Sequence, residues 1–198
     1  MIVRRRSGRP RASSWAVLEE AAGDLFLEQG YARTSIADIT RRAGVSRNTF
    51  FNYFTAKSDL LWSGFDSTFA DLPDVLLRHA DEPVDARVRS ALLELAGRLP
   101  PENVALAYGQ AEPMGLAEEL RQAAALRVSR VAAMLSKHAR GAGLHMLQAE
   151  VGATAYAGAL IAAIAEWSRL GASRNSLPEI LTTAWRPLVG ALEGDQQA

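Results

Sequence analysis

Apolar residues recur every three or four positions along most of the chain, and this spacing places them on one face of an α-helix. The first such segment covers residues 12–29 and is followed by Gly30, a residue type that commonly ends helices. Its apolar face consists of Trp15, Leu18, Ala22, Leu25 and Phe26. No segment shows the apolar–polar alternation of a half-buried β-strand. The pattern therefore predicts an all-α fold.

Two short helices joined by a tight turn are predicted next. Ser35 and Asp38 have the spacing of a capping box, which places a helix start at Ser35. Gly44 can adopt the positive φ of a tight turn, and Ser46 can then cap the second helix. The residues expected to point inward are Ile36, Ile39, Ala43, Phe50 and Phe54. A supporting helix followed by this pair is a helix-turn-helix.

Longer helices are predicted for the remainder, with Pro or Gly marking most of their ends. The expected spans are 55–72, the stretch between Pro83 and Pro100, 102–111, 116–140, 147–170 and 177–193. Ser176 and Glu179 form a second capping-box pattern, and Pro187 should kink or restart the last helix. The expected organisation is a basic arm over 1–12, a helix-turn-helix domain over 13–56 and a larger helical domain over 57–198.

Composition removes several classes of function. Hydrophobic residues make up 48% and charged residues 22% of the 198 positions, a globular balance. The absence of cysteine excludes disulfides, thiolate metal sites and cysteine nucleophiles, and three histidines leave little material for a metal site. No catalytic motif or Gly-rich phosphate loop stands out, so we expect no enzyme activity, no metal and no cofactor. The Arg-rich N-terminus lacks the apolar segment of a secretory signal. The longest uncharged stretch has 15 residues, fewer than the ~18 of a membrane span, so a cytoplasmic protein without a membrane partner is expected.

The net charge of zero hides an unequal distribution. Residues 1–57 contain ten basic and five acidic residues, whereas residues 58–198 contain twelve basic and seventeen acidic ones. A basic N-terminal part on an acidic body favours contact of the former with a polyanion. A chance fluctuation in surface charge is the alternative.

Residues 34–60 read TSIADITRRAGVSRNTFFNYFTAKSDL. They contain a Thr-Ser pair, an Asp-Ile pair, the run Ala43-Gly44-Val45-Ser46, an aromatic run ending in Phe54, then Lys57 and an acid before Leu60. This extended string resembles the DNA-binding signature of the tetracycline-repressor (TetR) family. The resemblance covers about the first 60 residues. It implies a DNA-binding head, followed by a larger helical domain that binds a small molecule and forms a homodimer.

The residue types around the second short helix suit double-stranded DNA. Arg47, Asn48 and Thr49 occupy its first turn, the end that reaches base edges in a major groove. Arg reads guanine and Asn reads adenine through paired hydrogen bonds. The predicted phosphate contacts are Asn52, Tyr53, Lys57, Thr34 and Ser35.

The basic arm contains Gly8-Arg9-Pro10-Arg11, which resembles the minor-groove core of AT-hook peptides. Arg9 and Arg11 are therefore candidate DNA ligands in a narrow A·T groove. The alternative is a flexible basic tail that adds only non-specific, salt-dependent affinity.

The helix at 147–170 is apolar on two sides and must be covered on both. Its small-residue side suits a second subunit, with the last helix completing the interface; the alternative is a fully internal helix in a monomer. The predicted dimer residues are Val151, Ala155, Gly158, Ala162, Leu181, Trp185 and Leu188.

The candidates for an effector pocket are apolar or aromatic residues of the larger domain, for each of which ordinary core packing is the alternative. They are Trp62, Phe65, Phe69, Tyr108, Met114, Met134, His138 and Tyr156. Few charges interrupt the apolar faces, which favours a mostly apolar effector. The resulting hypothesis is a regulator, in the first place a repressor, that binds a palindromic operator as a dimer and is released by a small molecule. An activator or dual regulator with the same DNA-binding mode is the alternative.

Overall fold

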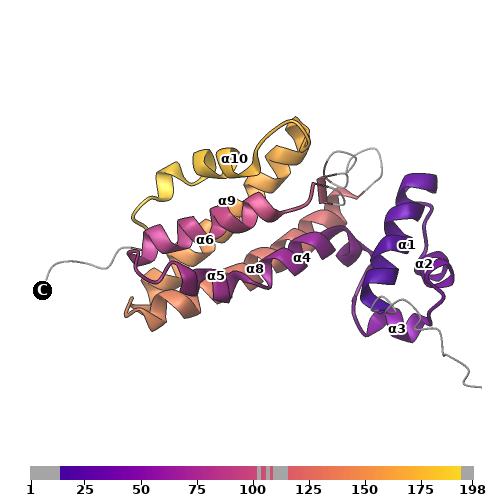
Figure 1. Cartoon of the computed structure of the whole chain (residues 1–198), viewed down its shortest axis with the longest axis horizontal. Helices are drawn as coiled ribbons and strands as arrows, with labels where there is room; N and C mark the ends of the chain where they lie inside the picture. Colours follow the sequence, from indigo (N-terminus) through magenta and orange to yellow (C-terminus); the bar gives the residue numbers. More distant parts are fainter. Residues whose placement is uncertain (1–13, 102–103, 106–107, 109–115, 193–198) are drawn as a thin grey trace, which may run out of the picture. The chain divides into compact units, whose positions relative to one another are not determined.

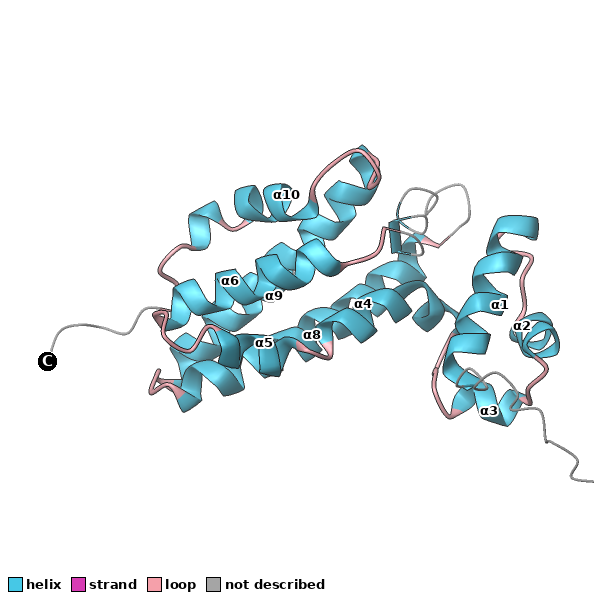
Figure 2. Cartoon of the chain, in the orientation of Figure 1, coloured by secondary structure: helices cyan, strands magenta, loops and turns pink. Residues whose placement is uncertain are grey.

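The computed structural model describes residues 14–101, 104–105, 108 and 116–192. Every described element is a helix, as predicted (Figure 2). The chain divides into two compact units at Leu60–Leu61, which we call the head and the body. Of the predicted site residues, Arg9, Arg11 and Met114 lie outside the described part of the chain.

The head is built from three helices: α1 (Ser14–Gln29), α2 (Ile36–Ala43) and α3 (Arg47–Phe51). Each helix contacts the other two. Their buried apolar side chains are Leu18, Ala21, Ala22, Leu25, Phe26, Ile39 and Phe50. The predicted capping box at Ser35 and Asp38 is present, and Gly44 takes the left-handed conformation with φ 66°. The helix-turn-helix geometry therefore arises from a cap and a glycine at the predicted positions.

The prediction of a single helix over 55–72 is wrong. Three shorter helices occupy the region: η1 (Lys57–Trp62), α4 (Ser63–Phe69) and α5 (Leu72–Arg78). Pro73 lies in the first turn of α5, where its missing N–H costs no helical hydrogen bond, so it helps to begin a helix instead of ending one.

The body is a helical bundle in which α8 (Ala117–Gly141) and α9 (Met146–Leu170) pack against each other (Figure 1). α6 (Val84–Arg98) contacts α5 and α10 (Leu177–Ala184), and α10 lies across α9 and α6. The short η2 (Arg186–Leu188) follows, so Pro187 marks a break as predicted. The predicted second capping box is absent, because the Ser176 side chain makes no capping hydrogen bond. Pro178 in the first turn of α10 lacks one of the N–H groups that a cap would satisfy.

α9 is long and apolar enough to pass a length-and-composition test for a membrane span, but half of that window is buried within the chain. Tyr156, Leu160 and Ile164 have no exposed surface and lie on the buried side. This burial is typical of a core helix. The opposite side, with Leu147 and Val151, is open in the single chain.

A buried carboxylate fastens the end of the described chain to the bundle. Asp85 is 1% exposed and accepts hydrogen bonds from the Tyr156 hydroxyl at 2.7 Å and from the N–H groups of Gly190 and Leu192 at 3.1 and 3.2 Å. Arg89, one turn along α6, pairs with the same carboxylate. Three neutral donors and one cation compensate for the burial of this charge. The partners lie up to 107 positions away in the sequence, so no local pattern indicated them.

Candidate nucleic-acid interface

The first turn of α3 presents polar side chains to solvent. The Ser46 hydroxyl accepts a hydrogen bond from the Thr49 N–H at 3.0 Å, which fixes where the helix begins. Arg47 and Asn48 follow directly and are exposed, whereas Thr49 is half-buried with its hydroxyl 2.9 Å from that of Ser46. Of the three predicted base-reading residues, Arg47 and Asn48 therefore have the freer side chains.

Aromatic side chains pack around the buried Phe50 and hold α3 in place. Phe50 is fully buried and meets Phe51 edge-on, with ring centroids 5.3 Å apart, and Phe54 at 5.4 Å. The Arg47 guanidinium lies 5.9 Å from the centre of the Phe51 ring, which remains 48% exposed. Such a cation–π contact restricts the conformations of Arg47 without neutralising its charge. Asn52 and Tyr53 are exposed at the end of the helix.

The structure corrects the prediction for Thr34. Its side chain is 1% exposed, and its hydroxyl is bonded to the Gly30 carbonyl at 2.9 Å and lies 3.3 Å from that of Leu25. A hydroxyl used in this way joins α1 to the start of α2 and does not face solvent as a phosphate donor. Ser35 stays exposed, but it is engaged with Asp38 in the capping box.

Lys57 has an internal role that the sequence did not indicate. Its ammonium donates to the carbonyls of Tyr31 and Thr34, both at 2.8 Å, and lies 3.7 Å from the centre of the Tyr31 ring. These contacts join η1 to the α1–α2 connection within the head. A local contact comes from Asp59, whose carboxylate accepts from the Thr55 N–H and hydroxyl just before η1.

Acidic residues of the head neutralise two of its arginines. Arg42 forms a two-pronged pair with Glu28 of α1, with N–O distances of 3.0 and 2.6 Å. Arg41 pairs with Asp38 at 3.0 Å. The hydrogen bond from Arg42 lowers the pKa of Glu28, and those from the Ser35 hydroxyl and N–H lower the pKa of Asp38. The guanidinium of Arg47 instead faces an aromatic ring, so its charge is available to a bound anion.

Residues 18–62 extend from within α1 to the end of η1. They match the family described as bacterial regulatory proteins, tetR family. Over these residues the chain resembles the tetR family. Two curated relatives from Mycobacterium tuberculosis are each 34% identical to it: MftR, named as a transcriptional regulator, over 90 residues, and Rv3405c, named as an HTH-type transcriptional repressor, over 96 residues. The matches cover 44% and 48% of this chain, and the chain spans about half the length of the curated relatives it matches (45% and 49%).

The likeness in fold to a solved structure extends over the body as well. The structure is similar to that of FadR from Thermus thermophilus, a transcriptional repressor solved with lauroyl-CoA, with a TM-score of 0.57 and 21% identity over 89% of this chain and 93% of FadR. At this identity the likeness shows the fold alone. The family and these relatives are regulators of transcription, not enzymes.

Four of the aromatic pocket candidates gather near an ion pair of the body whose arginine is buried. Trp62 contacts Phe65 and Tyr108 edge-on, and Phe65 stacks on Phe69 at 4.3 Å. Burial raises the pKa of Tyr108 to about 12.

The ion pair itself joins α4 to α8. Arg127, 1% exposed, donates to both carboxylate oxygens of Asp66, at 3.1 and 2.6 Å, and lies over the Trp62 ring at 5.4 Å. The Trp62 indole N–H is buried and finds no acceptor among the described residues. The sequence missed Arg127 and Asp66, because a pair 61 positions apart leaves no local pattern.

Met134 lies at two pockets. With Phe65, Phe69 and Arg127 it lines one of about 400 Å³, and with His138 it lines another of about 480 Å³ between α5 and α8. Tyr156 is a correction: it is fully buried, and its hydroxyl is held by Asp85 and the Leu188 carbonyl, so it belongs to the core.

The predicted dimer residues also divide into two groups. Val151 is 61% exposed and shares an open side of α9 with Ala155, Gly158 and Ala162. A Cβ built on Gly158 would meet no atom within 4 Å. The prediction for Leu181 and Trp185 needs correction, because both are buried in the body's own core.

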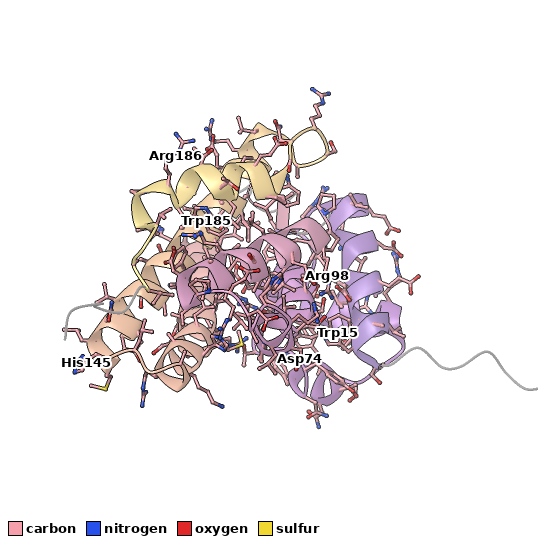
Figure 3. The ribbon with its side chains drawn as sticks, turned by 60° about the vertical axis from the view of Figure 1, so that its left-hand side comes forward. Trp15, Asp74, Arg98, His145, Trp185 and Arg186 are labelled. Atoms are coloured by element: carbon pink, nitrogen blue, oxygen red, sulfur yellow. The ribbon has the colours of Figure 1, made fainter. Side chains whose placement is uncertain are left out.

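Trp185 illustrates this burial. Its ring meets that of Tyr156 edge-on with centroids 5.9 Å apart, and it lies beneath α10 while Arg186 is on the outside (Figure 3). Leu188 is half-buried and remains a candidate at the margin.

Proposed function

We propose that this chain is a DNA-binding transcriptional regulator of the cytoplasm, and in the first place a repressor. The observation that carries the proposal is the first turn of α3. It offers exposed Arg47 and Asn48 from a helix fixed by the Ser46 cap and the buried Phe50. A short rigid helix with these side chains at its N-terminal end is suited to hydrogen bonding with base edges in a major groove.

A homodimer is part of the proposal for a physical reason. One five-residue helix reads too few bases to identify an operator in a genome. A two-fold dimer presents two such helices to half-sites about one helical turn or a multiple apart, and it therefore favours a palindromic operator. The open side of α9, with Leu147 and Val151 more than 60% exposed, supports this assembly.

Gly158 gives independent support for the same face. Gly inside a helix costs up to ~1 kcal/mol relative to Ala. Nothing in the single chain requires a glycine there, since a Cβ would meet open space. Close approach of a second helix would explain the glycine, as well as the neighbouring Ala155 and Ala162.

Release by a small molecule completes the proposal. The body is larger than DNA reading requires, and its pockets are lined mainly by apolar residues with a few charged ones. A ligand that binds one spacing of the two heads better than another would shift the dimer away from its operator. The repressor FadR, solved with lauroyl-CoA, is an example of this fold with an acyl ligand.

Selection of bound fragments from genomic DNA would test the proposal as a whole. The expected result is a near-palindrome with two half-sites. Enrichment of no sequence, or of single half-sites only, would contradict it. The position of the operator relative to a promoter would distinguish repression from activation.

Arg47→Ala tests the role of α3 directly. The variant should lose discrimination at one base position of each half-site, by about 1–3 kcal/mol, while binding to random DNA changes little. Arg41→Ala is the matched control, since Arg41 is exposed but paired with Asp38. Equal losses on operator and random DNA for Arg47→Ala would exclude base reading by this side chain.

A further inference from the structure

A pocket of about 480 Å³ lies in the body between α5, the start of α6 and the C-terminal half of α8. Pro73, Leu76, Leu77 and Met134 provide apolar walls. Its volume falls in the range of small-molecule sites, ~300–1,000 Å³. All its lining residues belong to the body, so the pocket is defined without reference to the head.

Every charged or titratable residue that lines this pocket is basic: Arg87, Lys137 and His138. No acidic side chain lines it. Two permanent positive charges beside apolar walls are suited to a ligand with one anionic end and an apolar body.

The hydrogen bonds of Arg87 all go to uncharged groups. Its guanidinium donates to the carbonyls of His79, Ala80 and Glu82 and lies 3.1 Å from Nε2 of His138. A guanidinium can only donate, so this imidazole is neutral and accepts through Nε2. All four partners are uncharged, and a half-buried guanidinium with such partners is stabilised by an anion.

Glu82 interacts electrostatically with Arg87, but its carboxylate is hydrogen-bonded to other groups. The Glu82 carboxylate accepts from the Ser90 hydroxyl at 2.7 Å and lies 2.8 Å from Nδ1 of His79. The C-terminal end of α8, whose partial negative charge would repel an anion, is also capped. The carbonyls of residues 138–140 accept hydrogen bonds from the N–H groups of Ala142, Gly143 and Leu144.

We propose that this pocket binds an amphipathic carboxylate, with its acid group between Arg87 and Lys137 and its apolar chain against Leu76, Leu77 and Met134. The inference deepens the effector part of the proposed function and rests on it for its biological meaning. The sequence predicted a mostly apolar effector, and the pocket adds one acid group to that apolar molecule. Binding itself can be measured without DNA.

Calorimetric titration of the full chain with decanoate, below its micellar concentration, tests the charge requirement. The expected result is one decanoate per chain, with affinity about tenfold higher than for 1-decanol or decyltrimethylammonium, which share the chain but not the charge. Equal affinity for the three probes would overturn the proposal.

Two variants test the location, and both alter exposed side chains. Lys137→Glu should weaken decanoate binding about tenfold, and Leu77→Asp should abolish it, while circular dichroism remains unchanged. Arg130→Glu is the matched control, because it makes the same charge change on an exposed residue of α8 outside this pocket. If Lys137→Glu and Arg130→Glu behave alike, the carboxylate does not bind here.

A DNA-binding measurement separates this inference from the proposed function. Operator binding without decanoate binding would refute the pocket assignment and leave the regulator intact. Decanoate binding that leaves operator affinity unchanged would support the binding site and refute its part in effector response.

Discussion

Lys57 is held by two carbonyls and one aromatic ring of its own domain. A lysine that contacts only DNA phosphate adds about one to the salt dependence of binding and nothing to folding. A lysine that donates to backbone carbonyls of its own domain stabilises the folded state, because hydrogen bonds from charged groups contribute about 1.5–3 kcal/mol to the free energy of unfolding. The two roles therefore have different experimental consequences.

We expect Lys57→Met, which keeps the length of the stem, to lower the free energy of unfolding by about 1–3 kcal/mol. Chemical denaturation followed by circular dichroism measures this loss. The slope of DNA affinity against salt should stay the same. The reverse outcome, an unchanged unfolding midpoint with a slope lower by about one, would establish the phosphate contact predicted from the sequence.

Asp38 makes the stability of the head depend on pH in acid. The Ser35 hydroxyl and N–H, followed by Arg41, lower its pKa below the ordinary 3.8. A carboxyl whose pKa is lower in the folded state stabilises the fold above its unfolded-state pKa and loses that contribution as the pH falls through the folded-state value. The head should therefore lose this stabilisation below about pH 4.

Asp38→Asn tests this linkage. The variant should be less stable than the unchanged chain at pH 7, and the difference should shrink towards pH 3, as measured by denaturant unfolding at both pH values. Ser35→Ala should reduce the same pH dependence by removing the hydroxyl donor. A stability difference that is constant with pH would show that the charge of Asp38 is not responsible.

At the scale of elements, local signals predicted the head well. Ser35, Gly44 and Ser46 act through contacts within a few residues, so their spacing alone specified two helices and a turn. The long helices α8 and α9 were also predictable, because their apolar periodicity extends over 25 residues each. The break between α4 and α5 was not, since Pro73 is compatible with either a helix end or a first turn.

The site was less predictable than the fold. The exposure of Arg47 followed from its place after a capping serine. Thr34 is buried by bonding back to Gly30 at the end of α1. The internal contacts of Lys57 depend on the α1–α2 connection lying against the start of η1, which no local spacing encodes. The contact between Arg87 and His138 spans 51 positions, so no local pattern could predict it either.

Two glycines of α9 predict opposite effects of the same substitution. A Cβ on Gly152 would lie 2.4 Å from Leu192 and 2.9 Å from the Ala191 carbonyl, whereas one on Gly158 would meet nothing. Gly152→Ala should therefore destabilise the body by about 1–3 kcal/mol through displacement of the C-terminal segment. Gly158→Ala, the matched control, should leave the isolated chain as stable or more stable by up to ~1 kcal/mol. Thermal unfolding compares the two, and equal effects would refute the close approach at Gly152.

At the scale of the whole molecule, assembly should depend on the open side of α9. Val151→Glu places a charge on a residue that is 61% exposed in the single chain, so folding should be retained. If two chains associate through this face, the buried charge should shift the protein from dimer to monomer and weaken operator binding strongly. Sedimentation analysis measures the mass.

Leu170→Glu is the control for that experiment. Leu170 is also an exposed apolar residue of α9, but it lies at the end of the helix and away from the Val151 side. It should leave the dimer intact. A Val151→Glu protein that remains dimeric would place the interface elsewhere.

The hydrogen bonds from Gly190 and Leu192 to Asp85 also affect the order in which the two units fold during translation. The head is a compact unit within the first 60 positions, so it can fold as soon as they leave the ribosome. The Asp85 carboxylate on α6 receives its two backbone hydrogen bonds only after about another hundred residues have been synthesised. A nascent chain should therefore carry a finished head on an unfinished body until translation has passed Leu192.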